Sequence, residues 1–275
     1  MRMNLYLLIL AHAGPGSVER LVRFFDVPGF RIGLHVDAKS EAAPFEAIAQ
    51  RFDHVACIGP RVDHLWGDWT MMDVHLNAIR WVAGQADVSH LVVISADTEP
   101  LRSAEAIRDY FAARPGKSVV DGEPWRPTGR VHRHSHTYYS PVQRWLRRKG
   151  QERLQNWVAR LLPRPEAKYR RFPADWQVML GRGWYGIARE HWAALLDFCG
   201  SEQGAGARYF KGTLVPEEHV FHTYLHNAVP DEVEHVRIMY ADYGPARPPV
   251  LDAAEITRLK AETDYLFARK VPLIP

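Results

Sequence analysis

The stretch Leu5-Tyr6-Leu7-Leu8-Ile9-Leu10-Ala11 decides the fold class, because it is continuously apolar, short, and ended by His12. A helix that crosses a bilayer needs roughly 20 apolar residues, so this run is too short to span a membrane. A signal peptide also needs a small-residue cleavage site after its apolar core, and Ala11-His12-Ala13 is a poor one. A short apolar run is typical of a parallel strand buried on both faces. We therefore predict that a sheet begins here.

Strand and helix patterns alternate after this first strand. Strands are expected at residues 31–36, 54–58 and 91–95, and helices at 17–25, 42–52, 70–83, 104–113, 192–198, 220–227 and 254–268. The alternation predicts an α/β fold with a mostly parallel sheet and helices on both faces. Ligands of such sheets bind beyond the carboxyl ends of the strands. That rule singles out Ala11-His12, Asp37-Ala38-Lys39 and Ser95-Ala96-Asp97.

Composition excludes several protein classes. The 275 residues are 47% hydrophobic and 24% charged, which is typical of a globular protein and not of a disordered chain, a collagen or a coiled coil. Cys57 and Cys199 are too few for a disulfide framework or a four-cysteine zinc site, and they indicate a reducing compartment. The net charge of +3 gives no reason to expect a nucleic-acid partner.

Charge is distributed unevenly along the chain. Residues 126–171 contain 13 Lys and Arg against two acids, which leaves the rest of the chain acidic and indicates an anionic partner for this segment. Within it, residues 141–162 mix tryptophans and other apolar side chains with arginines, which predicts one amphipathic helix. That helix either packs on its own domain, with arginine stems over apolar surface, or lies on an anionic membrane surface.

Two groups of side chains qualify as metal ligands. Asp97 and Glu99 follow a predicted strand, where two carboxylates can hold a divalent cation against a diphosphate, or can be ordinary loop carboxylates. His132, His134 and His136 would share one face of a strand and bind zinc. They stand among arginines without acidic or cysteine neighbours, which favours solvated or anion-contacting histidines.

The last third of the chain contains candidates for acid–base chemistry and anion binding. Pro216-Glu217-Glu218-His219 is expected to open a helix, whose dipole favours ionised carboxylates in its first turn. An ionised carboxylate beside a sugar hydroxyl is a suitable general base, whereas simple helix capping explains only one acid. Arg247 and Lys270, taken singly, resemble ordinary surface cations.

Several short motifs, taken in order, resemble the core-2/I-branching glycosyltransferases, the family that also contains the peptide O-xylosyltransferases. They are Leu8-Ile9-Leu10-Ala11-His12, His35-Val36-Asp37-Ala38-Lys39-Ser40, Trp66-Gly67-Asp68-Trp69, Ile94-Ser95-Ala96-Asp97-Thr98-Glu99-Pro100-Leu101, Gly181-Arg182-Gly183-Trp184 with Arg189-Glu190, Pro216-Glu217-Glu218 and Leu266-Phe267-Ala268-Arg269-Lys270. They span nearly the whole chain. No single motif is decisive, whereas their order is fairly specific.

The resemblance implies a GT-A-type fold, an inverting mechanism and a UDP-sugar donor, with no required cofactor and no essential metal. The catalytic base of the family corresponds to Glu218, and the two cations that neutralise the diphosphate in place of a metal correspond to Arg247 and Lys270. Fixed cations suit this task because negative charge develops on the leaving diphosphate. The further contacts implied for the UDP moiety are Ala11, His12, Asp37, Lys39 and Asp97, and those for the acceptor or donor sugar are Trp66, Arg182, Trp184 and Glu217.

The chain departs from the family pattern at a few positions. Ala96 replaces a glycine, Glu217 an aspartate and Arg182 a serine, and the last change leaves the sugar open between GlcNAc and a similar sugar such as xylose. The animal members of the family are membrane-anchored and rich in disulfides, features that this sequence does not share. We therefore expect a bacterial cytoplasmic enzyme that acts on a surface-glycan acceptor, with peripheral contact to the inner face of the membrane through residues 126–171 as an open alternative.

We expect one GT-A-like domain over residues 1–275. Residues 1–121 would bind the nucleotide sugar, residues 122–172 would form a basic insertion, and residues 173–275 would bind the acceptor and supply the base. Two rival hypotheses remain at this point. One is a metal-dependent GT-A glycosyltransferase that uses Asp97 and Glu99, and the other is a homologue that binds glycans or membranes without catalysis.

Overall fold

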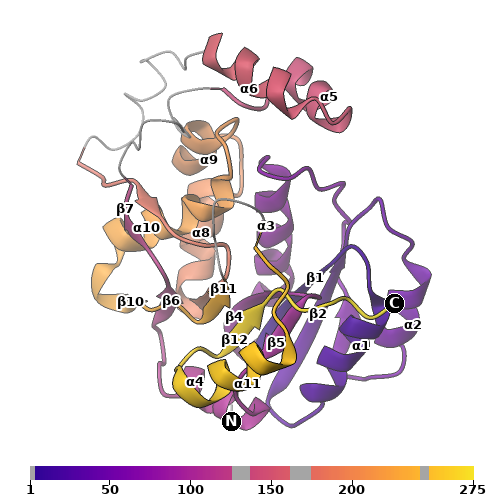
Figure 1. Cartoon of the computed structure of the whole chain (residues 1–275). Helices are drawn as coiled ribbons and strands as arrows, with labels where there is room; N and C mark the ends of the chain where they lie inside the picture. The colour runs from indigo at the N-terminus through magenta and orange to yellow at the C-terminus, as the bar shows by residue number, and fades with distance from the viewer. Residues whose placement is uncertain (1–3, 126–136, 162–174, 242–247) are drawn as a thin grey trace.

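The computed structural model describes residues 4–125, 137–161, 175–241 and 248–275. A seven-stranded sheet runs through the centre of the molecule (Figure 1). Its strands are β1 (Asn4–Ala11), β2 (Phe30–Val36), β3 (Val55–Cys57), β4 (Val88–Ser95), β6 (Ser118–Val120), β9 (Gly186–Ala188) and β10 (Val233–His235). Their order is β10-β6-β9-β4-β1-β2-β3, in which only β9 runs antiparallel to its neighbours. The expected α/β architecture with a mostly parallel sheet is confirmed.

The apolar run of β1 occupies the middle of this sheet. Leu7 pairs with Ile32 of β2 on one side and with Val92 of β4 on the other, so neither edge of β1 is exposed. Its odd-numbered side chains face the helices α1 (Pro15–Phe24), α2 (Ala43–Ala49) and α4 (Ala104–Ala112). Tyr6 and Leu8 face α3 (Thr70–Ala83), α8 (Trp192–Cys199), α9 (Ala205–Phe210) and α10 (Val220–Ala228). Burial on both faces explains why the strand sequence is continuously apolar.

A second, three-stranded sheet lies beyond the carboxyl end of β4. It consists of β11 (Met239–Ala241), β12 (Phe267–Arg269) and β5 (Thr98–Pro100), in that order, and α11 (Ala253–Glu262) lies beside it (Figure 1). The predicted helix over residues 254–268 is wrong in its second half, because the helix ends at Glu262 and residues 267–269 form a strand. Phe267 and Ala268 are fully buried there, so pairing with β5 and β11 outweighs the helical periodicity.

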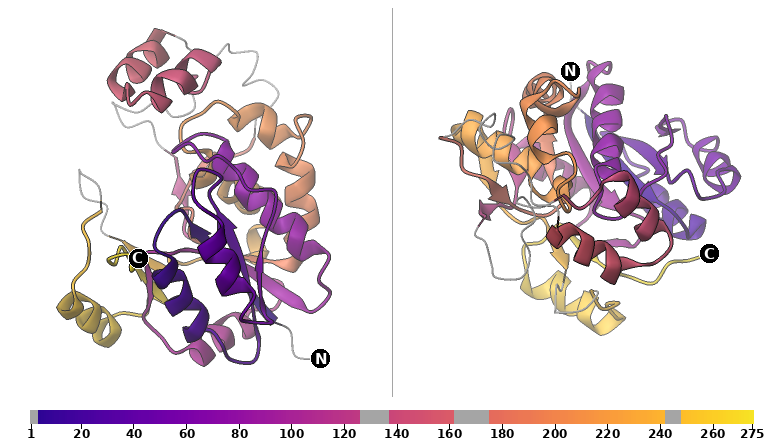
Figure 2. Two further views of the ribbon diagram at one scale, coloured as in Figure 1. Left: turned by 90° about the vertical axis from the view of Figure 1, so that its right-hand side faces the viewer. Right: turned by 90° about the horizontal axis from the view of Figure 1, so that it is seen from above.

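The predicted helix over residues 141–162 is two helices. They are α5 (Pro141–Arg148), capped by Ser140 and Gln143, and α6 (Glu152–Leu161). The chain reverses at Gly150, whose φ of 71° suits glycine far better than other residues. The pair, here called the α5–α6 hairpin, lies at one end of the molecule away from the central sheet (Figures 1 and 2).

Short elements complete the chain. A two-stranded sheet joins β7 (Glu123–Pro124) to β8 (Met179–Leu180), and 3-10 turns form at Arg189–His191, Pro216–Glu218 and Pro230–Glu232. In the part of the chain that the structure describes, every helix is too short or too polar to cross a membrane.

Candidate active site

Three strands of the central sheet end level with one another, and their ends bring distant motifs together. The backbone carbonyl of Ala11 accepts a hydrogen bond from Asp37 N at 2.9 Å, and that of Leu10 accepts one from Ala96 N at 3.0 Å. His12 is exposed directly after Ala11, and its carbonyl accepts a hydrogen bond from Ser40 Oγ at 2.6 Å. The rule that ligands bind at the carboxyl edge of a parallel sheet therefore picked out residues that do gather at one edge.

The carboxylate of Asp37 is buried and bound to the lysine two residues on. Its oxygens accept from Lys39 N at 2.9 Å and from Lys39 Nζ at 3.0 Å. Lys39 Nζ also contacts Asp63 Oδ1 at 3.0 Å, so two carboxylates compensate its charge. Arg61 binds the carbonyls of Val36 and Asp37, at 3.2 Å and 2.8 Å, and so fixes the loop that follows β2.

Asp97 lies at the end of β4 and forms an ion pair with Arg269 of β12. Arg269 Nη2 is 3.1 Å from Asp97 Oδ2 and 3.2 Å from Oδ1, and the Ser95 hydroxyl also donates to Asp97. The Arg269 guanidinium lies 4.4 Å from the centre of the Trp184 ring. A cation over an aromatic face is an attractive contact, so Arg269 joins the Asp97 loop to the Trp184 segment.

Glu99 faces different partners from Asp97. Its carboxylate contacts Arg20 Nη1 at 2.6 Å and Lys260 Nζ at 3.0 Å. Each oxygen of the Glu99 carboxylate therefore already contacts one cationic side chain. Among the described residues, no group of three or more His, Cys, Asp or Glu side chains is arranged to hold a metal ion.

Glu217 and Glu218 lie in a 3-10 turn that precedes α10, and not in the first turn of the α-helix as expected. The turn begins after Val215, whose φ of 55° is rare for a β-branched residue. Its backbone is fixed on two sides, because Val215 N donates to the Gly67 carbonyl at 2.8 Å and Gly181 N donates to the Glu218 carbonyl at 2.8 Å. The turn thus lies between two motifs that are remote in sequence.

The segment Gly181-Arg182-Gly183-Trp184 connects the glutamate turn to the Arg269 cluster. At one end, a Cβ on Gly181 would lie 2.1 Å from the Asp121 carbonyl, and a Cβ on Gly183 would lie 3.6 Å from Glu217 Cγ. At the other end, Trp184 contacts Arg269. The sequence motif therefore bridges the expected acceptor and diphosphate regions.

Arg182 is anchored on Asp121, a buried carboxylate that follows β6. Asp121 accepts from Arg182 N at 2.7 Å and from Arg182 Nη1 at 2.9 Å, and Arg237 Nε lies 3.4 Å away. The neighbouring His222 is fully buried, and this burial lowers its pKa to about 4, so its ring is neutral at pH 7. The arginines are therefore the cations that balance Asp121.

Trp66 is exposed and lies where the α5–α6 hairpin meets the rest of the chain. Its carbonyl accepts from the Tyr139 hydroxyl at 2.6 Å, and the Arg147 guanidinium lies 4.8 Å from the centre of its ring. Beside it, buried Asp68 accepts from Arg144 Nη2 at 3.1 Å. Arg148 contacts Asp63 at 2.6 Å, the same carboxylate that binds Lys39.

Two sequence-predicted sets cannot be placed. Arg247 and the histidines at 132, 134 and 136 lie outside the described residues. Lys270 is half-buried next to Arg269, and its carbonyl accepts from Leu251 N at 2.7 Å.

Sequence reasoning missed three residues that organise the site. Arg269 stood inside the basic C-terminal motif but received no role, although it contacts Asp97 directly. Asp121 follows a three-residue strand that the sequence analysis did not identify. Asp63 stands in a loop with no pattern, and only the fold shows that it contacts both Lys39 and Arg148.

Comparison with known proteins identifies the family. The model of the family described as Core-2/I-Branching enzyme matches residues 6–255, so the chain belongs to this family of glycosyltransferases. The match stops before the segment that carries Arg269 and Lys270. No curated protein matches the chain. Among solved structures, the 4-diphosphocytidyl-2C-methyl-D-erythritol synthase of Anaerococcus prevotii is similar with 14% identity and a TM-score of 0.31, over 46% of this chain and 59% of that one, less than two thirds of its length.

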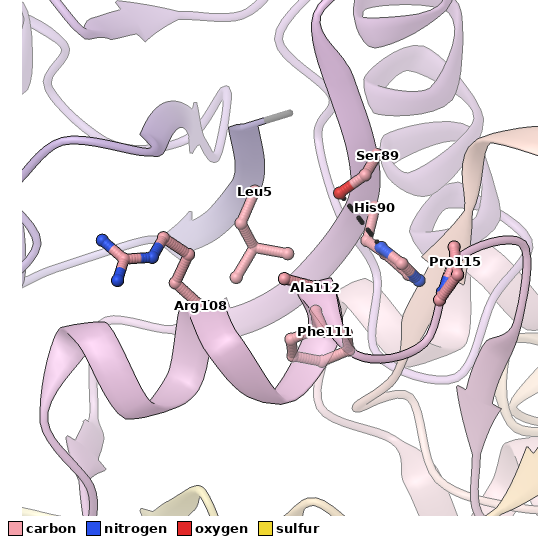
Figure 3. Close-up of a pocket in the computed structure, with 7 residues that line it drawn as sticks. All are labelled: Leu5, Ser89, His90, Arg108, Phe111, Ala112 and Pro115. Atoms are coloured by element: carbon pink, nitrogen blue, oxygen red, sulfur yellow. Dashed lines mark hydrogen bonds between the residues drawn. The ribbon is translucent and has the colours of Figure 1, made fainter. Parts of the chain in front are cut away.

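A cavity of about 190 Å³ opens at the opposite edge of the central sheet (Figure 3). It is lined by Leu5, Ser89, His90, Arg108, Phe111, Ala112 and Pro115, which come from the amino ends of β1 and β4, from α4 and from the turn that follows α4. The His90 ring contacts Ser89 Oγ at 3.1 Å and the Lys117 carbonyl at 3.0 Å, so its polar atoms are satisfied. The cavity lies apart from the carboxyl edge and is not part of the candidate site.

Proposed function

We propose that this protein is an inverting glycosyltransferase that moves GlcNAc, or a similar sugar such as xylose, from a UDP donor to a hydroxyl of a bacterial surface-glycan acceptor. The family match supports glycosyl transfer in general. The observation that carries the finer proposal is the Pro216–Glu218 turn, which presents two acids and is fixed to both the Trp66-Gly67 and Gly181–Trp184 motifs.

The proposed reaction has one chemical step. The Glu218 carboxylate takes the proton of the acceptor hydroxyl while the acceptor oxygen attacks the anomeric carbon of the donor sugar. The bond from that carbon to the diphosphate oxygen breaks, and UDP leaves with its electron pair on the opposite face. The products are the glycosylated acceptor with inverted anomeric configuration, UDP, and a protonated Glu218.

The backbone of the turn supports Glu218 as the base. A general base must be held within hydrogen-bond reach of the proton that it removes. Both peptide groups of Glu218 are tied down, the N–H to the Val215 carbonyl at 3.1 Å and the carbonyl to Gly181 N at 2.8 Å. We propose that four further side chains contact the acceptor or the donor sugar. They are Glu217, which lies next to Gly183, Arg182, which is anchored on Asp121, and the two tryptophans Trp66 and Trp184.

The diphosphate is proposed to lie near the carboxyl ends of β1, β2 and β4. Ala11, His12, Asp37, Lys39 and Asp97 would contact the UDP moiety, and Lys270 and Arg247 would balance the charge of the leaving group. Lys270 is adjacent to Arg269, which already places a cation at Asp97. Since cations also bind both oxygens of Glu99, we propose that transfer needs no divalent metal.

A panel of UDP-sugars, each with and without EDTA, tests the proposal. We expect UDP and one UDP-sugar to raise the melting temperature equally in both conditions, and that sugar to be released or transferred. Stabilisation that requires Mn²⁺ or Mg²⁺ would instead assign Asp97 and Glu99 to a metal site. The absence of any shift would favour a homologue that binds glycans without catalysis.

A further inference from the structure

The α5–α6 hairpin buries two polar side chains and exposes five large apolar ones. Gln143 and Gln155 are almost fully buried, and their side-chain amides donate to the carbonyls of Thr137 at 2.6 Å and Tyr138 at 2.9 Å. The two glutamines occupy equivalent places in the two helices, one residue after Val142 and Leu154. This inward face attaches the hairpin to the molecule, so its outward face is available to a partner.

Five large apolar side chains lie on the exposed part of the hairpin. On α5, Val142 and Trp145 are spaced by three residues, and on α6, Leu154, Trp157 and Leu161 follow helical spacing. The two tryptophans are 58% and 56% exposed. The buried positions of the hairpin are instead taken by Gln143, Leu146, Gln155 and Ala159. Exposed apolar residues scattered singly are ordinary, whereas a cluster indicates an interaction surface.

Exposed cations stand near these apolar residues in the sequence of the hairpin. Lys149, Arg153 and Arg160 are exposed and form no ion pair with any residue that the structure describes. Three other arginines of the hairpin point inward to Asp68, Trp66 and Asp63. Glu152 is the one acid in residues 137–161, and it is paired with Arg147 at 3.0 Å. The outward charge of the hairpin is therefore positive.

We propose that the α5–α6 hairpin docks on the surface of an anionic phospholipid bilayer. Tryptophan favours the boundary between headgroups and acyl chains, because its ring is apolar and its N–H is polar. Arginine and lysine beside such a face attract acidic headgroups. A soluble polyanion would match the cations and leave the apolar side chains in water, whereas the bilayer matches both features.

The hairpin is coupled to the candidate active site by its inward face. Arg144 contacts Asp68 and Tyr139 contacts the Trp66 carbonyl, and the adjoining Gly67 binds Val215 at the start of the Glu217-Glu218 turn. A bilayer under the hairpin would therefore lie beside the acceptor side of the site. Resting on the proposed glycosyl transfer, this placement suits an acceptor that is itself anchored in the membrane.

Vesicle sedimentation tests the surface without any sugar nucleotide. The full chain is mixed with phosphatidylcholine vesicles that contain or lack 30% phosphatidylglycerol, and the bound fraction is measured at low and high salt. We expect binding to the anionic vesicles only, weakened as salt shortens the Debye length from about 10 Å at 0.1 M to about 3 Å at 1 M. Two hairpin variants should each weaken binding at least about tenfold. One is the double variant Trp145→Ser/Trp157→Ser, and the other is the triple variant Lys149→Gln/Arg153→Gln/Arg160→Gln.

A control variant keeps the test specific. Trp81→Ser removes a tryptophan of α3 that is 42% exposed, and it should bind vesicles like the wild type. Three results would overturn the proposal. They are no binding to anionic vesicles, equal binding to both vesicle types, and hairpin variants that bind as the wild type does. In a fourth result, the wild type self-associates without binding vesicles, and Trp145→Ser/Trp157→Ser abolishes that self-association. This result would also overturn the proposal, because it would assign the exposed face to a second copy of the chain. Because the assay measures no transfer, failure of the proposed enzyme activity gives a separate result.

Discussion

Arg269 places its guanidinium 3.1 Å from the carboxylate of Asp97, and this ion pair connects the end of β4 to β12. Both side chains are largely buried, at 14% and 11% exposure. A charge buried next to its partner becomes costly when that partner is removed. Removal of either partner would therefore leave an uncompensated charge at the carboxyl edge of the sheet.

We predict that Arg269→Met lowers the free energy of unfolding by about 2–3 kcal/mol, because Asp97 would remain buried without its cation. The double variant Arg269→Met/Asp97→Asn should be less destabilised than the sum of the single variants, because it leaves no charge unpaired. Urea titrations of the four proteins measure this coupling. Strict additivity would show that the ion pair contributes nothing.

Arg144 is the contact through which α5 neutralises a buried acid. Asp68 is 1% exposed, and burial raises its pKa, while Arg144 opposes that rise. Because Arg144 is itself 40% exposed, we expect Arg144→Leu to cost about 2 kcal/mol, or about 5 °C in melting temperature. Arg153→Leu removes an exposed arginine of α6 and should change stability by less than about 0.5 kcal/mol. Equal melting temperatures for the two variants would contradict the role of the Arg144–Asp68 pair.

Gly181 has no room for a side chain. A Cβ would lie 2.1 Å from both the Asp121 carbonyl and the His222 ring, so Gly181→Ala must displace the backbone that binds the Glu218 carbonyl. We expect it to lose about 1–3 kcal/mol of stability and most of the transfer activity. At Gly183 the nearest atom would be Glu217 Cγ at 3.6 Å, an ordinary contact, so Gly183→Ala should fold normally. Comparable melting temperatures for both variants would be incompatible with this packing.

Buried histidines predict a loss of stability in acid. Burial lowers the pKa of His35, His64 and His222 to about 4 and that of His75 to about 3. In the unfolded chain the pKa of histidine is near 6.5. Below that pH, these histidines are therefore protonated in the unfolded chain while they remain neutral in the folded chain. The free energy of unfolding should therefore be fully retained above pH 6.5 and fall between pH 6.5 and about 4, by up to about 1.4 kcal/mol per pH unit for each histidine.

His35→Leu tests this pH dependence directly. Both ring nitrogens of His35 lack a hydrogen-bond partner in the described part of the chain, so leucine should be tolerated. Denaturant midpoints measured at pH 7.5 and pH 5.5 should differ less for the variant than for the wild type. An unchanged difference would mean that His35 is not one of the groups that titrate.

The sequence predicted the parallel core of the fold because local patterns there agree with tertiary structure. The helix expected at residues 70–83 is α3 without change, and the strand at residues 31–36 is β2 within one residue. At Phe267 the sequence pattern predicted a helix, and this prediction was wrong. Phe267 lies in a strand because β5 and β11 pair with that segment on either side. Gly150 divided the predicted amphipathic helix, and it lies within residues 147–153, a stretch without apolar side chains that interrupts the helical pattern.

The sequence predicted individual residues of the candidate site but not the side chains that contact them. The motifs identified Asp37, Asp97 and the two glutamates, and the structure places the first two at one edge of the sheet. The partners that hold them, such as Asp63 and Arg269, come from segments far away in sequence. Their roles depend on distances in the folded chain, which spacing does not encode.

The most direct measurement compares Glu218→Gln with the wild type and with Glu217→Gln, using the active UDP-sugar and acceptor. Glutamine keeps the size of glutamate and cannot accept the proton, so Glu218→Gln should keep its melting temperature and its affinity for UDP while transfer falls by about 10²–10⁴-fold. Glu217→Gln should retain kcat within about tenfold, because its proposed contact is with a sugar and not with the proton in transfer. Wild-type turnover by Glu218→Gln would contradict the assignment of the base and, with it, the proposed mechanism.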